Sequence, residues 1–373
     1  MTHQIENMKQ HKVIISGGGS GGHIFPAIAI AIAIEKRVND VEFLFVGAED
    51  RMEMEKVPNA GYKIIGLWIS GLQRNLDKRN LLFPFKVLHS IWKAKKIVRE
   101  FKPDLAIGTG GYASAPLLYA AAKKGVPALI QEQNSYPGIT NKNLAKYVQK
   151  ICVAYDNMER FFPLDKMIIT GNPIREDILG FDAQKEKAQI KFEIDKTKPT
   201  VLVVGGSLGA LTINNAIAEN LQQIKDMNVN LIWQTGVSYQ HKSQQYITDV
   251  NVKGINAFTF IKEMDLAYAA ADIIISRAGA IAISELCCVG KPIILVPSPN
   301  VAENHQYKNA QSLVNKNAAL LVEDAKANRK LVNTLKDLIE NKELKDSLSS
   351  NIKKIAVTDA ADRIAKIALD LVK

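Results

Sequence analysis

The stretch Val13-Ile-Ile-Ser-Gly-Gly-Gly-Ser-Gly-Gly-His23 decides the fold. Its apolar start predicts a short buried strand, its glycines predict a tight turn, and the apolar run after His23 predicts a helix. A second stretch of the same plan begins near Thr200 and ends in Gly-Gly-Ser-Leu-Gly-Ala at residues 205–210. Because a strand that enters a helix through a glycine-rich turn is typical of doubly wound α/β domains, the sequence predicts two of them.

Short apolar, β-branched runs recur around both turns, with helix-like stretches between them. We expect strands at residues 13–16, 43–46, 105–107, 128–130, 151–153 and 167–170, and a second set at 200–205, 231–235, 257–260, 273–276, 293–296 and 319–322. Buried strands that alternate with helices favour parallel sheets covered on both faces. The interpretation is an α/β protein with two Rossmann-like domains, residues 1–175 and 176–373, that face each other across a cleft. The last helix is a candidate to cross back onto the first domain.

The composition is that of an ordinary globular chain, with 47% hydrophobic and 23% charged residues among 373. That length favours about two domains. The three cysteines, Cys152, Cys287 and Cys288, form no disulfide framework and suggest a reducing compartment. The polar N-terminus carries no apolar signal core, and the apolar run 24–34 is too short to span a bilayer. We therefore expect a cytoplasmic location.

Most of the net charge of +10 lies in one window, residues 63–102, which holds ten basic and two acidic residues. Leu88, Ile91, Trp92 and Val98 fall on one helical stripe there, among lysines. Basic charge with interfacial aromatic residues favours an anionic membrane surface. The alternative is a helix that buries this stripe in the core. No nucleic-acid reader motif appears, so no nucleic-acid partner is expected. The residues expected to dock are Trp68, Leu72, Leu82, Phe83, Phe85, Lys86, Trp92, Lys93 and Lys96.

The first glycine turn is expected to bind a ligand through bare backbone N–H groups and the positive end of the next helix. It lacks the Gly-Lys-Ser/Thr of a Walker loop, and no acid clearly ends the second strand as in dinucleotide-binding folds. His23 lies at the end of the turn. There it acts either as a general base on an acceptor hydroxyl or as a packing residue.

Two further segments of the second half suit a nucleoside diphosphate. Ser207 lies in the second glycine turn, where a phosphate contact and a purely structural turn are equally reasonable. The N–H groups of Ala280, Ile281 and Ala282 would open a helix toward a diphosphate, and Glu285 is either a ribose ligand or a capping acid. The chain contains no Asp-x-Asp triplet, so we expect helix termini and Arg175, without a metal or other cofactor, to neutralise a leaving diphosphate.

Seven motifs then occur in one order: Gly-Gly-Gly-Ser-Gly-Gly-His (17–23), Gly-Thr-Gly-Gly-Tyr (108–112), Gln-Glu-Gln-Asn (131–134), Gly-Asn-Pro-Ile-Arg (171–175), Gly-Gly-Ser-Leu-Gly-Ala (205–210), Ser-Arg-Ala-Gly-Ala (276–280) and Asn-His-Gln (304–306). Together they resemble the peptidoglycan N-acetylglucosaminyltransferases of glycosyltransferase family 28. The resemblance spans almost the whole chain, and it implies the two-domain GT-B fold.

The resemblance implies inverting transfer of GlcNAc from UDP-GlcNAc to the lipid-linked acceptor lipid I, forming lipid II, at the cytoplasmic face of the membrane. It gives His23, Glu132 and Tyr112 to the acceptor side as catalytic residues. The implied UDP-GlcNAc contacts are Ser20, Gly21, Gly22, Asn134, Arg175, Ser207, Ile261, Ala280, Ile281, Ala282, Ile283, Ser284, Glu285 and Gln306. Glu285 would bind the ribose and the Ile261 backbone the uracil. Other cell-wall synthesis proteins are candidate partners.

Two departures from the family pattern affect these expectations. Ser20 replaces a frequent threonine and keeps the hydroxyl, whereas Ala282 replaces a threonine and loses a side-chain phosphate contact. The alternatives are another UDP-sugar enzyme of this fold, such as a 2-epimerase or a glycolipid transferase, a non-enzymatic clamshell binding protein, and a Rossmann dehydrogenase. The basic window argues against the epimerase, and the missing export signal argues against the binding protein.

Overall fold

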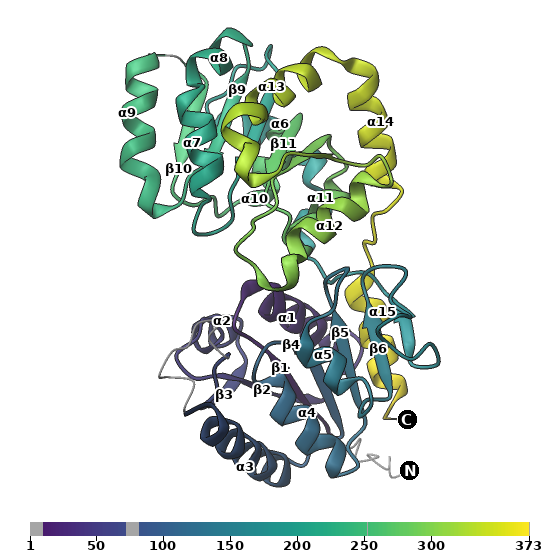
Figure 1. Ribbon diagram of the computed structural model, residues 1–373. Helices are drawn as coiled ribbons and strands as arrows, with labels where there is room; N and C mark the ends of the chain where they lie inside the picture. The colour runs from purple at the N-terminus through teal and green to yellow at the C-terminus, as the bar shows by residue number, and fades with distance from the viewer. Residues whose placement is uncertain (1–9, 72–81, 252, 373) are drawn as a thin grey trace, which may run out of the picture. The chain divides into compact units, whose positions relative to one another are not determined.

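The computed structural model describes residues 10–71, 82–251 and 253–372, which form two units. The first unit contains the chain up to Ile174 together with the segment from Asp359 onward, and the second runs from Arg175 to Thr358. The expected boundary lay one residue further along, after Arg175. Figure 1 colours the first unit purple to blue, with its C-terminal segment in yellow.

The sheet of the first unit is parallel throughout, in the order β3-β2-β1-β4-β5-β6-β7. Its strands are β1 (His11–Gly17), β2 (Val41–Ala48), β3 (Lys63–Leu67), β4 (Leu105–Gly110), β5 (Ala128–Glu132), β6 (Lys150–Val153) and β7 (Met167–Ile169). Strand β3 was not predicted, because Lys63–Leu67 lies at the start of the basic window and was interpreted as part of it. An edge strand buries less and so carries a weaker apolar signal.

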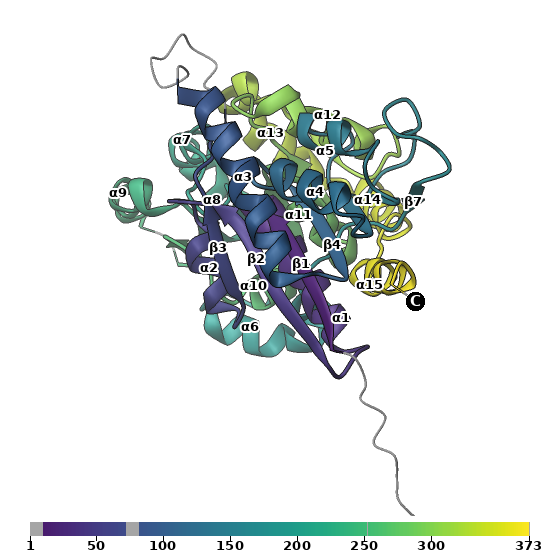
Figure 2. The same ribbon diagram turned by 90° about the horizontal axis from the view of Figure 1, so that it is seen from below.

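Helices cover both faces of this sheet. They are α1 (Gly21–Glu35), α2 (Glu53–Asn59), α3 (Phe83–Phe101), α4 (Ser114–Lys123), α5 (Ile139–Leu144) and α15 (Ala360–Asp370). Ile14 points into the core shared with α3, α4 and α5, whereas Val13 and Ile15 point into the core shared with α1 and α15. Figure 2 shows α3 and α4 side by side on one face. The strict alternation along β1 is the two-residue period of a buried strand.

Helix α1 is apolar on most of its surface because it is covered twice. It packs on β1 and β4 and also makes extensive contact with α15, whose Ile364, Ala365 and Ala368 are buried in the same core. A helix covered on two sides buries most of its surface and needs little polar face, and here Phe25 and Ile32 are 41% and 37% exposed. The apolar run at residues 24–34 is therefore a core helix.

The second unit repeats this architecture with the order β10-β9-β8-β11-β12-β13, again parallel throughout. Its strands are β8 (Thr200–Val204), β9 (Asn230–Gln234), β10 (Ile255–Phe258), β11 (Ile273–Ser276), β12 (Ile293–Leu295) and β13 (Leu320–Leu321). Its α-helices are α6 (Lys185–Lys191), α7 (Leu211–Glu219), α8 (Leu221–Asp226), α9 (Gln240–Val250), α10 (Met264–Ala270), α11 (Ala280–Val289), α12 (His305–Val314), α13 (Ala327–Glu340) and α14 (Lys342–Lys353). The predicted pair of doubly wound parallel sheets is confirmed.

The strand order places both glycine turns at equivalent positions. In the first sheet β1 lies between β2 and β4, and in the second β8 lies between β9 and β11, so the direction of winding reverses at each of these strands. Ligands of doubly wound sheets bind outside the carboxyl ends of the strands at this reversal. The turns that follow β1 and β8 are therefore the first places to look for a site.

Candidate active site

Packing inside the first unit and backbone conformation together account for three of the five glycines in the turn after β1. A Cβ on Gly17 would lie 1.9 Å from Thr109 Oγ1, and one on Gly18 would lie 2.1 Å from Glu53 Oε1. Gly19 has φ +82°, a conformation that side chains disfavour. The sequence argument, which assigned the glycine density to a ligand, was therefore too strong for these three positions.

The remaining two glycines, Gly21 and Gly22, begin α1 and leave its first turn open. A Cβ on Gly22 would meet only Ser20 Oγ, at 3.6 Å, and one on Gly21 would touch the ring of Phe25 at 3.1 Å. Ser20 is the N-cap residue, but its side chain makes no capping hydrogen bond. The first N–H groups of a helix lack intrahelical partners, so this turn can receive an anionic or hydroxyl-bearing ligand.

His23 is held by one ring nitrogen so that the other is left to react. Its Nδ1 lies 3.0 Å from the Gly18 carbonyl and 3.2 Å from Ser20 Oγ. Because a carbonyl oxygen only accepts hydrogen bonds, Nδ1 must carry the proton, and Nε2 keeps its lone pair. Burial lowers the pKa of His23, while the Glu132 carboxylate and the bond to Gly18 oppose that shift. A neutral imidazole with a bare Nε2 is the form that a general base requires.

Glu132, at the end of β5, is saturated with hydrogen-bond donors. Its carboxylate is 2% exposed and accepts from the N–H groups of Asn134 (3.0 Å) and Gly138 (3.1 Å) and from the side-chain amides of Asn134 (3.2 Å) and Asn141 (2.9 Å). A carboxylate offers about four acceptor sites, so none remains for a substrate proton. The geometry gives Glu132 the task of ordering the loop that carries Asn134.

Tyr112 follows β4 and lies beside the same glycine turn. Its phenol occupies the space that a side chain on Gly71 would need, because a Cβ on Gly71 would lie 2.2 Å from the Tyr112 hydroxyl. A Cβ on Gly19 would lie 3.8 Å from the edge of the Tyr112 ring. It is 46% exposed. The structure thus brings His23 and Tyr112 together at the carboxyl edge of β1 and β4, although they are 89 residues apart in sequence.

In the second unit, two side chains expected to bind the donor bind each other. Glu285, on α11, accepts from Arg175 Nε at 3.1 Å and from the Tyr268 hydroxyl at 3.3 Å. Burial raises the pKa of Glu285, and Arg175 opposes that shift. Burial also raises the pKa of Tyr268 well above its ordinary value, so this phenol is a donor at neutral pH. Sequence reasoning missed Tyr268 because no local pattern links it to Glu285.

The start of α11 is open. Gly279 is its N-cap residue, and a Cβ there would meet nothing within 4 Å. The N–H groups of Ala280, Ile281 and Ala282 form the first turn and have no partner within the helix by geometry. The Ser284 hydroxyl donates to the Ala280 carbonyl, and Ile283 is 2% exposed in the core. Those two side chains are therefore not directed at a ligand.

The backbone expected to receive uracil is already engaged. The N–H of Ile261 donates to Gln234 Oε1 at 2.8 Å, which leaves its carbonyl as the group for a base edge. Gln234 Nε2 donates to the Gly206 carbonyl at 2.9 Å and so holds the turn that carries the exposed Ser207. The side-chain oxygen Oε1 of Gln306 accepts from the backbone N–H groups of Ala278 and Ser298 at 3.3 and 2.8 Å. The side-chain NH₂ of Gln306 is therefore the end available to a sugar.

The cysteines beside Glu285 have no reactive thiolate. Burial raises the pKa of Cys287 to about 12 and that of Cys288 to about 11. Cys288 Sγ donates to the Val357 carbonyl at 3.7 Å. Cys287 acts as a small core side chain, and Cys288 is partly buried beside it. Among the residues that the structure describes, no group of three or more His, Cys, Asp or Glu side chains could hold a metal ion.

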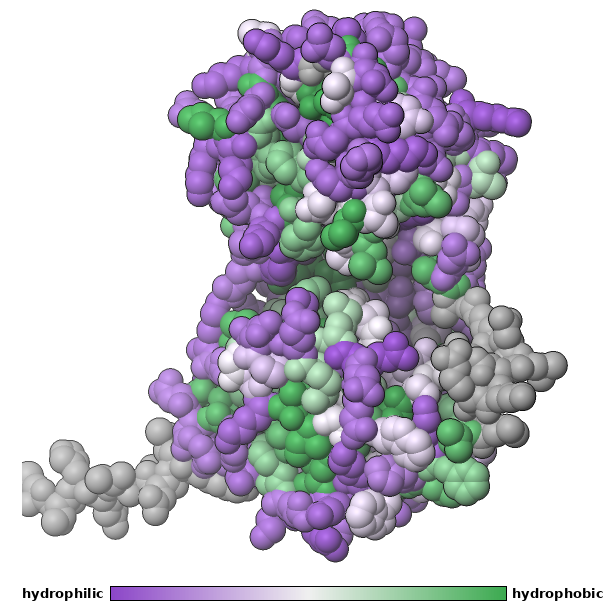
Figure 3. All heavy atoms as spheres, turned by 90° about the vertical axis from the view of Figure 1, so that its left-hand side faces the viewer, coloured by the Kyte–Doolittle hydropathy of each residue, from purple (hydrophilic) through white to green (hydrophobic). Residues whose placement is uncertain are grey.

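The helical stripe expected on α3 divides between two environments. Leu88 and Trp92 are 66% and 62% exposed, whereas Val98 is buried with Ala94 and Ile97 against the sheet. Phe85, three residues before Leu88, is also exposed. The prediction of one continuous stripe was wrong, because the exposed and buried faces of the helix each carry apolar residues. Figure 3 shows hydrophobic side chains at the surface on the face of the first unit that it displays.

We define the exposed apolar surface by Trp68, Leu82, Phe85, Leu88 and Trp92. Trp68 meets the His89 ring edge to face, at a ring-centroid distance of 5.7 Å, and Trp92 lies tilted against the same ring at 6.1 Å. Leu72 lies outside the described residues, and Phe83 is half-buried at the start of α3.

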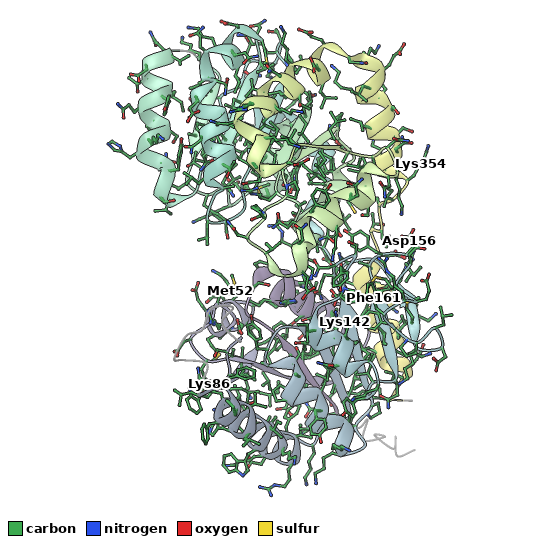
Figure 4. All side chains as sticks on the ribbon, in the orientation of Figure 1. Met52, Lys86, Lys142, Asp156, Phe161 and Lys354 are labelled. Carbon is green, nitrogen blue, oxygen red and sulfur yellow. The ribbon has the colours of Figure 1, made fainter. Side chains whose placement is uncertain are left out.

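The lysines around this surface are partly paired. Lys86, labelled in Figure 4, donates to Ser70 Oγ at 3.0 Å and lies 5.5 Å from the Trp68 ring centroid. Lys93 pairs with Glu49 at 2.9 Å, and Lys96 approaches Glu100 at 3.9 Å. Lys93 therefore adds less positive charge than its place in the sequence suggests. In the described residues, no helix is long and apolar enough to cross a membrane.

Comparisons with known proteins agree with this arrangement. Residues 13–153 match the glycosyltransferase family 28 N-terminal domain, and residues 200–364 match the C-terminal domain of that family. Among solved structures, Acinetobacter baumannii MurG has a TM-score of 0.79 at 26% identity, covering 97% of this chain and all of that one. A UDP-GlcNAc 2-epimerase from Neisseria meningitidis, at 14% identity and a TM-score of 0.67 over 97% of this chain and all of that one, shares the fold.

The chain belongs to glycosyltransferase family 28. Curated relatives narrow the membership further. A protein from Cytophaga hutchinsonii is 54% identical over 98% of both chains, and one from Parabacteroides distasonis is 53% identical over 96% of this chain and 97% of the relative. Both are named UDP-N-acetylglucosamine–N-acetylmuramyl-(pentapeptide) pyrophosphoryl-undecaprenol N-acetylglucosamine transferase. Within the family, the chain groups with these transferases.

Two glycine substitutions separate packing from ligand space. Gly18→Ala should destabilise the chain by about 1–3 kcal/mol, because its Cβ overlaps the Glu53 carboxylate that the backbone holds in place. Gly22→Ala should leave stability unchanged or raise it by up to about 1 kcal/mol, because alanine favours a helix and the position is open. Urea unfolding measures both. Equal destabilisation by the two substitutions would contradict this account of the turn.

Proposed function

We propose that this chain transfers GlcNAc from UDP-GlcNAc to undecaprenyl-pyrophosphoryl-MurNAc-pentapeptide (lipid I), with inversion at the sugar carbon, to make lipid II for peptidoglycan. The observation that carries the proposal is His23, a half-buried imidazole whose Nδ1 is fixed by the Gly18 carbonyl, whose Nε2 keeps its lone pair and whose pKa is lowered by burial, next to the open first turn of α1. The match over nearly the full length to transferases named for this activity supports the same reaction.

The first unit would bind the acceptor. In the proposed step, Nε2 of His23 takes the proton from the acceptor hydroxyl as its oxygen forms a bond to the anomeric carbon of GlcNAc. The bond from that carbon to the diphosphate oxygen breaks, and UDP leaves with the electron pair. Tyr112 and the open N–H groups of Gly21 and Gly22 lie beside His23, where they can position the acceptor. Glu132 would contribute through the loop that carries Asn134, which is proposed to contact the transferred sugar.

The second unit would bind the donor. The first turn of α11 offers N–H groups and the positive end of a helix dipole to the diphosphate, which gains negative charge as UDP leaves. Arg175 and Ser207 are proposed to join it there. Glu285 accepts from Arg175 Nε on one oxygen and from Tyr268 on the other, so its remaining lone pairs would receive the ribose hydroxyls while the outer nitrogens of Arg175 reach the phosphate. The Ile261 carbonyl would read the uracil, and the Gln306 amide would contact sugar hydroxyls.

The exposed apolar surface on the first unit would dock on the cytoplasmic face of an anionic membrane. Phe85, Leu88 and Trp92 are more than half exposed, and Lys86 lies beside them. Aromatic rings and lysines together suit the region between lipid headgroups and acyl chains. A protein held there meets its lipid-linked acceptor in two dimensions.

The transfer itself is tested by acceptor-dependent release of UDP. Purified protein with UDP-GlcNAc should release UDP only when a lipid I analogue is present, and the product should contain one added GlcNAc. His23→Gln should lower kcat by about 10²–10⁴-fold, because a general base contributes that much, while UDP binding stays within about twofold. Release of UDP without acceptor would favour another UDP-sugar enzyme, and a near-normal His23→Gln rate would remove the base assignment.

The pH profile gives a second measure of the same group. His23 acts as a base only when neutral, that is, above its pKa, and burial lowers that pKa. The acidic limb of kcat/KM, which reports the free enzyme, should therefore lie below the pH at which an ordinary histidine titrates, and the residual activity of His23→Gln should lack this limb. A limb above pH 7 in the unaltered chain would contradict the assignment.

The Arg175–Glu285 pair predicts a selective effect on the donor. Glu285→Gln should weaken UDP binding about tenfold in calorimetry, because an amide accepts ribose hydroxyls less strongly than a carboxylate. Asp177→Asn is the matched control, since Asp177 also faces Arg175, at 3.7 Å, but is half exposed. It should change UDP binding by less than about twofold. Equal effects of the two substitutions would mean that Glu285 acts only by its charge on Arg175.

Membrane docking is tested with vesicles. The double variant Leu88→Ser with Trp92→Ser should reduce sedimentation with anionic vesicles about tenfold or more, because each exposed apolar side chain contributes burial in the interface. The fold should be unaffected, since both side chains are exposed. Ile190→Ser, at a site 74% exposed on the second unit, is the control and should bind normally. Unchanged binding of the double variant would place the dock elsewhere.

A further inference from the structure

Glu53, the first residue of α2, is a buried carboxylate to which no function has yet been given. It is 0% exposed, and both of its oxygens accept from the Gly19 N–H, at 3.1 and 3.0 Å. Oε1 also accepts from the Ala48 N–H at 2.9 Å. Two glycines leave room for this side chain. A Cβ on Gly18 would lie 2.1 Å from Oε1 of Glu53, and a Cβ on Gly47 would lie 2.5 Å from its Cγ.

The Gly18 carbonyl and the Gly19 N–H belong to the same peptide group. Its N–H donates to Glu53, and its carbonyl accepts from Nδ1 of His23. Because a trans peptide is planar, its N–H and C=O point in opposite directions, and fixing one end fixes the other. A continuous chain of hydrogen bonds therefore runs from the Glu53 carboxylate through one peptide group to the His23 ring.

This peptide group needs to be held because both of its residues are glycines. With no Cβ on either side, the plane can turn over at little steric cost. After such a turn an N–H would face Nδ1, and His23 would have to carry its proton on Nε2 instead. That tautomer has no lone pair where the acceptor hydroxyl is proposed to lie, so it cannot take the proton.

We propose that Glu53 is a positioning residue for proton transfer: by binding the Gly19 N–H, it holds the Gly18 carbonyl toward His23 and keeps the proton of that ring on Nδ1. The inference rests on the proposed role of His23 as base. The carboxylate also polarises the peptide group, which strengthens the carbonyl as an acceptor, and its negative charge favours the imidazolium formed when Nε2 takes a proton.

Nitrogen NMR of the histidine rings tests this without any substrate. The full chain labelled with ¹⁵N-histidine contains six histidines, and His23→Gln identifies the His23 signals by their loss. The unaltered chain should show a protonated Nδ1 and an unprotonated Nε2 at pH 7.5. In Glu53→Gln the His23 signals should move toward the opposite tautomer or an average of the two.

Kinetics supply the second readout. Glu53→Gln should lower kcat by about 10- to 100-fold, a part of what the base contributes, with the KM for UDP-GlcNAc changed by less than about twofold. Its acidic limb should shift to lower pH, because a charge that favours the imidazolium has been removed. Glu53→Asp, which keeps the charge, should recover part of the rate. Glu55→Gln is the matched control on the same helix, because that carboxylate is 67% exposed and pairs with Lys56; it should behave normally.

The two arms separate this inference from the proposed function. If the unaltered chain transfers no sugar, the proposed function fails whatever the NMR shows. An Nε2-protonated His23 in the unaltered chain, or the same His23 signals and acidic limb in Glu53→Gln as in the unaltered chain, would overturn the role of Glu53. If Glu53→Gln melts at a similar temperature to Glu55→Gln, loss of fold is excluded as the cause of a lower rate.

Discussion

The carboxyl edge of the first sheet is organised by buried carboxylates that bind backbone N–H groups. Glu53 ties the loop after β1 to the loop after β2, and Glu132 ties the loop after β5 to α5. Each carboxylate accepts hydrogen bonds from more than one N–H group. These bonds replace the hydrogen bonds to water that a charged group loses when it is buried. His23 lies between these two groups, and both carboxylates raise the basicity of its ring against the opposing effect of burial.

The second sheet uses a neutral side chain for the equivalent task. The turn after β8 is held by the amide of Gln234, which donates to the Gly206 carbonyl and accepts from the Ile261 N–H. An amide adds no negative charge beneath the turn. A carboxylate in that place would repel the diphosphate that is proposed to bind there, whereas the carboxylate beneath the first turn favours the positively charged form of His23. The same topology is thus adapted to two opposite electrostatic requirements.

The sequence predicted the features that depend on local pattern. Alternating apolar runs located most of the strands of both sheets, and the turn from Gly17 to Gly22 predicted the β1–α1 junction. Prediction from the sequence failed where the apolar pattern was weak or mixed. Strand β3 is an edge strand inside a basic window, and helix α3 has apolar residues on both its buried and its exposed faces. The residues that position others were also missed. Glu53 is 34 residues from Gly19, and Tyr268 is 17 from Glu285, so only the fold brings each pair together.

Helix α15 has a consequence for the order in which the protein is made. It completes the core of the first unit, where Ile364, Ala365 and Ala368 cover α1, yet it is encoded after the whole of the second unit. A chain emerging from the ribosome therefore exposes one apolar side of α1 throughout the synthesis of about two hundred further residues. The first unit therefore cannot complete its core until residues 360–370 have been synthesised.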